Sequence, residues 1–169
     1  MLTQAISKTL KFSLIVLMAV MVVDVTWQII TRFILGNPSS YTEELAGFLL
    51  IWIGLLGASY ALYTRSHLGI DIITARLSGV KRQISELLIN LVILLFSLFV
   101  LVIGGIRLVN LTYTLKQISP ATGIPMAWVY LVLPLTGVLM MYYALVFMIS
   151  ALRKNDATDA ATHLKPVDL

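Results

Sequence analysis

The chain has 169 residues, of which 59% are hydrophobic and 12% are charged. Its mean hydropathy of +0.95 excludes an ordinary water-soluble domain, in which about 25% of residues carry charge. The absence of cysteine and the presence of only two histidines exclude disulfides and thiolate metal sites and argue against a haem held between helices. The net charge of +4 is assigned to membrane topology rather than to nucleic-acid binding, because Lys and Arg near helix ends orient membrane proteins.

Four apolar runs are long enough to cross a lipid bilayer. About 20 helical residues span the roughly 30 Å hydrocarbon layer. Three of the runs, residues 45–64, 87–106 and 117–152, contain no charged side chain, and residues 12–31 contain only Asp24. The sequence therefore predicts an all-α integral membrane protein with one membrane domain over residues 1–152. Its four transmembrane helices are expected at about residues 8–35, 42–64, 84–110 and 125–152.

Basic residues are divided unequally between the two sides of these spans. Nine Lys and Arg lie in the N-terminus, the connection between the second and third helices and the C-terminal tail, and three lie on the opposite side. Because cytoplasmic segments carry the excess of Lys and Arg, both termini are expected in the cytoplasm, with the protein in a bacterial inner membrane. The tail, residues 153–169, is polar and lacks aromatic residues, which predicts disorder.

Asp24 lies near the middle of the first predicted helix, about 16 Å along the axis from Leu35. It shares a helix face with Gln28 and Thr31. An ionisable residue at this depth indicates an ion or proton site. No second carboxylate lies at mid-membrane depth in the other predicted helices, so a hydrogen-bonded contact with a neighbouring helix is the preferred interpretation.

The connection between the first two helices is short and has readable ends. The first helix is expected to stop at the breaker in residues 36–38, which read Gly, Asn, Pro. The second helix begins with a capping-box pattern, in which Ser40 is the expected N-cap and Glu43 the third helical residue. Because Arg32 and Glu44 flank this antiparallel turn at one membrane depth, we expect them to form an ion pair, partly buried against a partner.

Small residues form a stripe along the second predicted helix. Gly47, Gly54, Ala58 and Ala61 fall on one face at 100° per residue. Small residues allow helix backbones to approach closely in lipid, so this face is predicted to pack against a helix of this bundle or of a partner. The three tryptophans are expected to contact lipid or a partner rather than to form a ligand cage: Trp27, Trp52 and Trp128.

The connection between the second and third helices has an amphipathic pattern. Residues 66–83 place apolar side chains at helical spacing among basic ones, which predicts a short helix on the inner membrane surface. His67 and Asp71 are spaced for an i, i+4 contact there. A solvated histidine is the preferred interpretation, and a pH sensor is the alternative.

Prolines mark the start and the middle of the last predicted helix. Pro125 follows a loop punctuated by Pro120 and Gly123 and fits the first helical turn. Pro134 lies farther along and cannot donate a hydrogen bond to the Tyr130 carbonyl, so a kink is expected near it.

No sequence motif indicates catalysis or a cofactor. The P-loop, GxGxxG, HExxH and GxSxG patterns are all absent, and no metal-ligand cluster is apparent, so neither an enzyme nor a metalloprotein is expected. Because a second intramembrane carboxylate is missing, the chain is not expected to act as a pump on its own. Two rival interpretations are kept: a small four-helix exporter that uses Asp24 for proton coupling, and, ranked below it, an intramembrane enzyme.

Two segments resemble one family of membrane proteins. Residues 32–73, RFILGNPSSYTEELAGFLLIWIGLLGASYALYTRSHLGIDII, and residues 119–137, SPATGIPMAWVYLVLPLTG, are similar to the two signature regions of the small, DctQ-type membrane subunit of tripartite ATP-independent periplasmic (TRAP) transporters. With the helix count, length and topology, the resemblance covers nearly the whole chain. It is carried by the following residues in order: Arg32, Glu43, Glu44, Trp52, Gly57, His67, Asp71, Pro120, Pro125 and Pro134.

The resemblance implies two protein partners and a division of labour. A large membrane subunit would carry the substrate and sodium sites and move as an elevator, and a periplasmic binding protein would deliver an organic anion, for which sialic acid is the first guess. The small subunit would enlarge the fixed scaffold, in contact with membrane lipids and without a transport site of its own.

Overall fold

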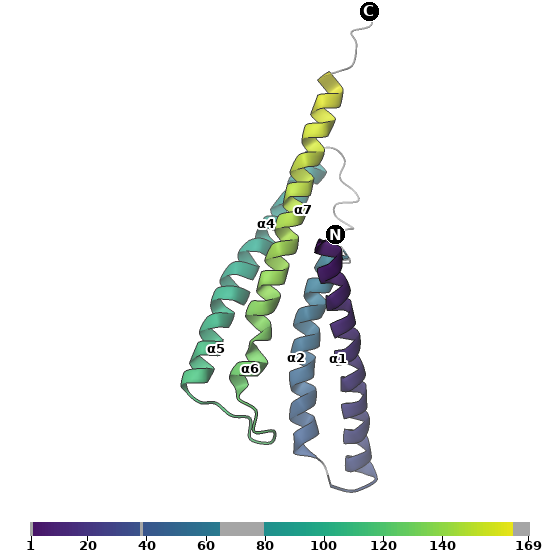
Figure 1. Cartoon of the computed structure of the whole chain (residues 1–169), viewed down its shortest axis with the longest axis vertical. Helices are drawn as coiled ribbons and strands as arrows, with labels where there is room; N and C mark the ends of the chain where they lie inside the picture. The colour runs from purple at the N-terminus through teal and green to yellow at the C-terminus, as the bar shows by residue number, and fades with distance from the viewer. Residues whose placement is uncertain (1, 38, 65–79, 164–169) are drawn as a thin grey trace, which may run out of the picture.

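The computed structural model describes residues 2–37, 39–64 and 80–163, and the described chain is a bundle of long helices (Figure 1). Within these residues, four helical stretches are long and apolar enough to cross a membrane: Thr3–Phe33, Ser40–Tyr63, Ile84–Thr114 and Met126–Ala151. The predicted all-α fold with four transmembrane helices is therefore confirmed. The predicted amphipathic segment lies outside the described residues except for its last four, which begin the helix that leads into the third span.

The first two spans form an antiparallel hairpin. Helix α1 runs over Leu2–Phe33 and helix α2 over Ser40–Tyr63. At the end of α1 the chain turns at Gly36, whose φ of +65° is a backbone conformation that glycine adopts without a steric penalty. The Asn37 amide then donates a hydrogen bond to the Thr31 carbonyl at 3.1 Å, which satisfies one of the carbonyls that a helix end leaves free.

The third span changes helix type along its length. Helix α4 covers Val80–Phe96, a π-helical stretch η1 covers Ser97–Gly104, and helix α5 covers Gly105–Thr114. At the start of η1 the Ser97 hydroxyl donates to the Ile93 carbonyl at 2.7 Å, and a side chain that enters the backbone ladder in this way distorts a helix. The sequence pattern did not predict the π-helical stretch.

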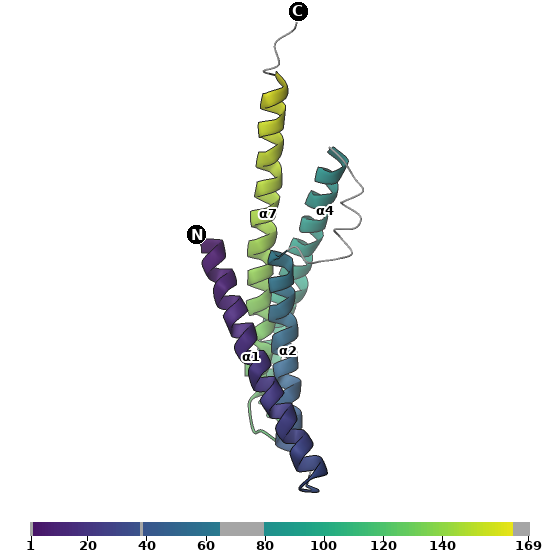
Figure 2. The ribbon, with the colours of Figure 1, turned by 90° about the vertical axis from the view of Figure 1, so that its right-hand side faces the viewer.

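The fourth span is interrupted near its beginning. Helix α6 covers Met126–Tyr130, and helix α7 covers Val132–His163. The break at Leu131 lies three residues before Pro134, within the turn whose carbonyls lose a partner because proline has no N–H. Helix α2 and helix α7 run in the same direction, with the start of α1 and the far end of α7 at the same end of the bundle (Figures 1 and 2).

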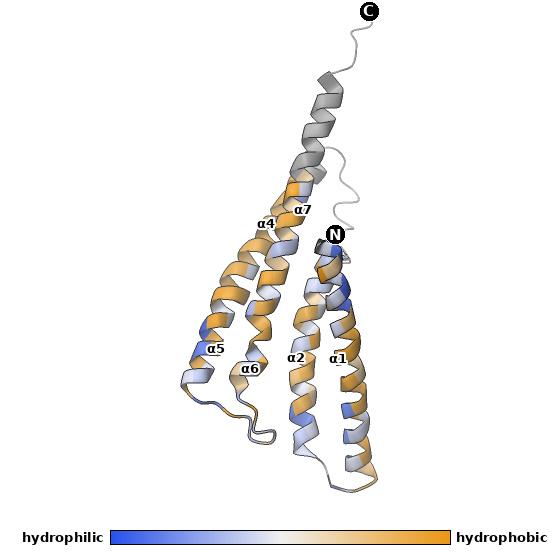
Figure 3. Cartoon of the chain, in the orientation of Figure 1, coloured by the Kyte–Doolittle hydropathy of each residue, from blue (hydrophilic) through white to orange (hydrophobic). Residues whose placement is uncertain are grey.

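The core of the bundle lies along α7, where this helix packs against α2 and against η1. Its fully buried side chains include Tyr143, Val132 and Thr136 of α7, with Ser59 of α2 and Ser97 of η1. Elsewhere the helices expose large apolar side chains, and Figure 3 shows apolar residues along most of the helix surfaces with hydrophilic ones gathered near the helix ends. An apolar outer surface is what a lipid-embedded chain requires.

The helices extend beyond several predicted ends. Helix α1 begins at Leu2 rather than near residue 8, α5 ends at Thr114 rather than near residue 110, and α7 continues to His163. Residues 153–163 contain several alanines and neither Gly nor Pro, so nothing stops helix propagation there. The predicted disorder of residues 164–169 lies outside the described residues and stays a prediction.

Candidate functional site

Glu44 joins the start of α2 to the loop between α5 and α6. One carboxylate oxygen, Oε2, accepts hydrogen bonds from the Ser119 hydroxyl and from the backbone amides of Ala121 and Thr122, the latter two at 3.2 and 3.1 Å. The two hydroxyls of this loop, on Ser119 and Thr122, also bond each other. We call these four residues the Glu44 clasp. Because bonds to a charged acceptor are stronger than neutral ones, the clasp fixes the loop against the end of α2.

The loop that the clasp holds has a defined shape of its own. The Met126 amide donates to the Gln117 carbonyl at 2.9 Å, and the Ser119 amide donates to the Ile124 carbonyl at 3.0 Å. Gly123 closes the turn with a φ of +69°. Residues 117–126 are therefore a compact loop, tied internally by backbone bonds and externally by Glu44. Pro125 is the N-cap of α6 rather than a residue of its first turn.

The predicted Arg32 to Glu44 ion pair is wrong for this chain. Glu44 is held by the loop, and among the described residues no ion pair includes Arg32. The exposed guanidinium of Arg32 instead lies 5.9 Å from the centre of the Phe33 ring. The expected partner of Glu44 was a residue across the short turn, but a loop 75 residues away supplies its hydrogen-bond donors instead.

The predicted capping box at the start of α2 is also wrong. The N-cap is Ser39 and not Ser40, and its side chain makes no capping hydrogen bond. This shift places Thr42 at the third helical position, and its hydroxyl donates back to the Ser39 carbonyl at 2.9 Å. Glu43 is exposed in the first turn, where its charge is favourable near the positive end of the helix dipole.

Trp52 makes a second link between α2 and the last span. Its indole N–H donates to the Val129 carbonyl of α6 at 3.1 Å. This carbonyl lies beside the break at Leu131, where Pro134 disturbs the backbone ladder. The indole also packs against the core. The structure therefore gives Trp52 an internal role, whereas the sequence predicted a lipid or partner contact.

Asp24 is buried on α1, and among the described residues no hydrogen bond joins its side chain to another helix. Its side chain is 8% exposed, and its Oδ2 has no hydrogen-bond partner in the part of the chain that the structure describes. It borders a small apolar cavity of about 440 Å³ together with Trp27 and Leu45. The described residues therefore do not make the hydrogen bond between Asp24 and a neighbouring helix that the sequence analysis preferred. Three core hydroxyls, of Ser59, Thr136 and Tyr143, are likewise buried without a partner there.

The closest helix approaches are not at the predicted stripe. A Cβ added to Gly47 or Gly54 would meet nothing within 4 Å, and both glycines are exposed, while Ala58 packs against the core. A Cβ on Gly105 would lie 2.9 Å from the Leu133 Cβ, and one on Gly137 would lie 2.8 Å from the Leu101 Cβ. Close packing therefore joins the third and fourth spans, and the first half of the stripe is left uncovered.

The described residues contain no group of three or more His, Asp or Glu side chains that could hold a metal ion. His67 and Asp71 lie outside the described residues. The largest cavity we describe, about 700 Å³, lies between α1, α2 and α7 and is lined almost entirely by apolar side chains. The arrangement therefore offers hydrogen-bonded joints between helices and apolar surfaces rather than a cluster of reactive groups.

Sequence reasoning missed the Glu44 clasp, although part of the signal was visible. Ser119 and Thr122 are the hydroxyl residues of the SPATG segment, and the predicted topology places that segment on the same side as Glu44. The two hydroxyl groups, and the backbone amides of a tight turn, can donate hydrogen bonds to a carboxylate at the same membrane depth. This pattern could have identified the loop as the partner of Glu44, but the sequence analysis expected an ion pair with Arg32 instead.

The sequence matches known transporter proteins over most of its length. Residues 13–154 match the family model described as "Tripartite ATP-independent periplasmic transporters, DctQ component". The chain is 30% identical over 142 residues to the small permease protein SiaQ of a sialic acid TRAP transporter from Vibrio cholerae, covering 84% of this chain and 80% of the relative.

Two longer permease proteins also match, and the matches cover only a small part of them. SiaT, the permease protein of a sialic acid TRAP transporter from Haemophilus influenzae, is 30% identical over 115 residues, which are 68% of this chain and 18% of SiaT. DctMQ, the permease protein of an isethionate TRAP transporter from Oleidesulfovibrio alaskensis, is 36% identical over 100 residues, 59% of this chain and 16% of DctMQ. With its four apolar spans, the chain belongs to the DctQ family of small membrane subunits of TRAP transporters.

Proposed function

We propose that this chain is the non-catalytic small permease subunit of a sodium-gradient-driven, binding-protein-dependent transporter of organic anions. In this proposal it is part of the fixed scaffold against which a large elevator subunit moves. The membership of the small-permease family is the observation that carries the proposal.

The large membrane subunit is the partner best supported by the relatives. The matches to SiaT and DctMQ cover less than a fifth of each of those permeases, as expected if each joins a small and a large part in one chain. A scaffold role agrees with the described bundle, in which α2 is fastened to the last span and its connecting loop by Glu44 and Trp52. A periplasmic binding protein completes the proposed system.

We select sialic acid as the first substrate to test, because SiaQ and SiaT are named for it. Isethionate is the second, because DctMQ is named for its transport. Both are organic anions. The substrate sites are assigned in this proposal to the large subunit, so the small chain is not expected to discriminate between them.

Reconstitution tests this proposal directly. The chain is co-expressed with a candidate large TRAP subunit, purified through a tag on the small chain and placed in proteoliposomes with a matching binding protein. Uptake of labelled substrate should require the large subunit, the binding protein and an inward sodium gradient. Proton-driven transport by the small chain alone, abolished by Asp24→Asn, would contradict the proposal and establish the rival exporter.

The proposed orientation places both termini in the cytoplasm of a bacterium with the protein in its inner membrane. Because the chain has no cysteine, single cysteines can report on each side. Cysteine at Ser39 or at Thr122 should react with an impermeant maleimide added outside intact spheroplasts, whereas cysteine at Ala157 should react only after lysis. The reverse labelling pattern would show the opposite orientation.

A further inference from the structure

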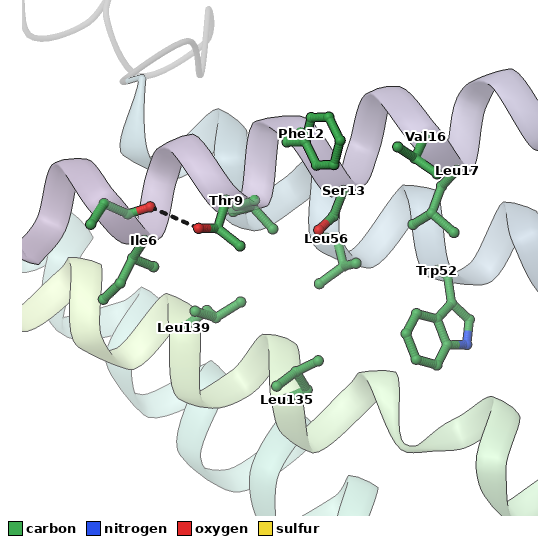
Figure 4. A pocket seen from close by; sticks show the side chains of 12 residues that line it. Ile6, Thr9, Phe12, Ser13, Val16, Leu17, Trp52, Leu56, Leu135 and Leu139 are labelled. Atoms are coloured by element: carbon green, nitrogen blue, oxygen red, sulfur yellow. Dashed lines mark hydrogen bonds between the residues drawn. The ribbon is translucent and has the colours of Figure 1, made fainter.

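The cavity between α1, α2 and α7 is an elongated groove lined by side chains of all three helices (Figure 4). Its wall on α1 extends from Ala5 to Leu17, a length of about 18 Å at 1.5 Å per residue. Trp52 of α2 and Leu135 and Leu139 of α7 face this wall. The groove thus follows the direction of the transmembrane helices, with one end near the start of α1 and the other near the middle of that span.

Two hydrogen bonds hold the helices around the groove in place. Near the start of α1, Thr3 and the Tyr142 hydroxyl of α7 are 3.0 Å apart. At the opposite end, the Trp52 indole is anchored to the Val129 carbonyl. These contacts fix α1, α2 and α7 relative to one another, so the space of about 700 Å³ is a property of the folded chain.

The chemistry of the walls selects an apolar occupant. The Thr9 hydroxyl already donates to the Ala5 carbonyl of its own helix at 3.1 Å, and the Trp52 N–H is used by Val129. Of the side chains that line the groove, this leaves the Ser13 hydroxyl as a polar group free to contact an occupant (Figure 4). A molecule bound there would therefore be held by burial of hydrocarbon and not by a set of hydrogen bonds.

The size of the groove suits a slender apolar molecule. Its volume of about 700 Å³ lies within the roughly 300 to 1,000 Å³ of small-molecule pockets. In a bilayer, the slender apolar molecule present at the highest concentration is a lipid acyl chain.

A positive charge borders the half of the groove nearest the start of α1. Lys8 is exposed there, and α1 has no acidic residue before Asp24. Lys11 is also exposed, but at 100° per residue it lies on the face of α1 opposite the lining residues. Lys8 follows Ala5 by three residues and precedes Phe12 by four, so it borders the groove face of the helix. Lysine side chains on α1 lean toward its N-terminal end, and a long lysine stem allows the ammonium group to reach the headgroup layer.

We propose that this groove binds one acyl chain of an anionic phospholipid, whose headgroup is held by Lys8. The occupant follows from the combination of an apolar groove about 18 Å long and a cation that borders its half nearest the start of α1. This inference does not depend on the substrate, the binding protein or the direction of transport.

Trp52 provides an internal probe of the groove, because its indole lines the wall (Figure 4). In the full chain with Trp27→Phe and Trp128→Phe, Trp52 is the remaining tryptophan. It is reconstituted in phosphatidylcholine vesicles that contain increasing amounts of either phosphatidylglycerol or phosphatidylcholine with brominated acyl chains. Bromine quenches a nearby indole, so brominated phosphatidylglycerol should reach half-maximal quenching of Trp52 at a mole fraction roughly fivefold lower than brominated phosphatidylcholine.

Matched variants separate this site from general contact with lipid. A chain that keeps only Trp27, which does not line the groove and is 53% exposed, should be quenched equally by the two brominated lipids. Lys8→Gln should remove the preference at Trp52, while Lys11→Gln, on the opposite face of α1, should retain it. Ser13→Phe, which fills the groove, should reduce the quenching of Trp52 by either lipid.

Three results would overturn the proposal. The first is equal quenching of Trp52 by the two brominated lipids in the parent chain, and the second is an unchanged preference in the Lys8→Gln variant. The third is loss of the selective quenching when the large subunit is bound, which would assign the groove to a helix of that subunit. Uptake assays play no part in these measurements, so failure of the proposed transport function would leave the result interpretable.

Discussion

At the residue scale, Glu44 shows how one carboxylate can organise a distant loop. Its Oε2 accepts bonds from the side chain of Ser119 and the backbone amides of Ala121 and Thr122. Glutamate supplies a full negative charge to these donors, whereas glutamine supplies a weaker acceptor and adds donors that the site does not need. The charge of Glu44, and not only its shape, should therefore matter.

We expect Glu44→Gln to loosen the loop while the four spans remain folded. Amide hydrogen exchange at Ala121 and Thr122 should become several times faster, because their acceptor is weakened. Glu43→Gln is the matched control, since Glu43 is adjacent and exposed. Equal exchange rates in the two variants, measured by mass spectrometry on protein in nanodiscs, would show that the clasp does not order the loop.

For Asp24 we expect that replacing the carboxylate stabilises the chain, because its buried Oδ2 has no partner among the described residues. Asp24→Leu removes an unsatisfied polar atom and directs an apolar side chain toward the neighbouring cavity. We expect the free energy of unfolding of the isolated chain to rise by about 1 to 3 kcal/mol. Thermal unfolding in detergent measures this, with Asp24→Asn as the polar control. A lower stability of Asp24→Leu than of Asp24→Asn would indicate that Asp24 makes a favourable contact.

At the element scale, the third and fourth spans depend on two glycines for their contact. A Cβ on Gly137 would lie 2.8 Å from both the Leu101 Cβ and the Val102 Cγ2, and one on Gly105 would lie 2.9 Å from the Pro134 Cδ. These are closer than side-chain carbons normally approach. The π-helical stretch η1 lies along this contact, so the irregular helix and the close approach occur together.

We expect Gly137→Ala and Gly105→Ala each to lower the free energy of unfolding by about 1 to 3 kcal/mol, the usual cost of overpacking. Gly47→Ala and Gly54→Ala are matched controls, because an added Cβ there meets nothing within 4 Å. Chemical or thermal unfolding of the four variants in the same detergent provides the comparison. Equal changes of stability in all four variants would show that steric overlap at Gly105 and Gly137 does not determine the effect.

The elements differ in how well the sequence predicted them. Runs of about 20 apolar residues can satisfy their backbone in lipid only as helices, so the four spans followed from composition. The N-cap at Ser39 and the helical end at His163 did not, because local patterns for helix ends are weak and neighbouring hydroxyl residues compete for the same position. The π-helical stretch and the partner of Glu44 depend on contacts between spans, and sequence spacing does not identify which spans meet.

At the scale of the whole molecule, the first half of the small-residue stripe is available to a partner. Gly47 and Gly54 are exposed on α2, although α2 is one of the helices that form the core. Small residues at a membrane-facing surface permit close approach of another helix. We therefore expect this face to contact the large subunit proposed above.

Gly54→Leu should reduce recovery of the large subunit in pull-down from membranes, because the added side chain holds the two backbones apart. The variant itself should keep the unfolding temperature of the parent chain, since nothing in the described bundle lies within 4 Å of a Cβ at this position. Val100→Leu, a change at a half-exposed site on η1, is the control for added apolar volume. Normal recovery with Gly54→Leu would place the partner on another face.

The Glu44 and Trp52 contacts also have a consequence for the order in which the protein is assembled. The α1 and α2 hairpin is synthesised first, and the partners of Glu44 and Trp52 follow 75 to 78 residues later. During this interval the carboxylate has none of its loop donors, and the indole N–H has no carbonyl to bind. The first hairpin is thus inserted with two vacant attachment points, which the second hairpin fills on arrival. Biogenesis then resembles the docking of two preformed halves, and a chain broken between the hairpins should still assemble when both pieces are made in one cell.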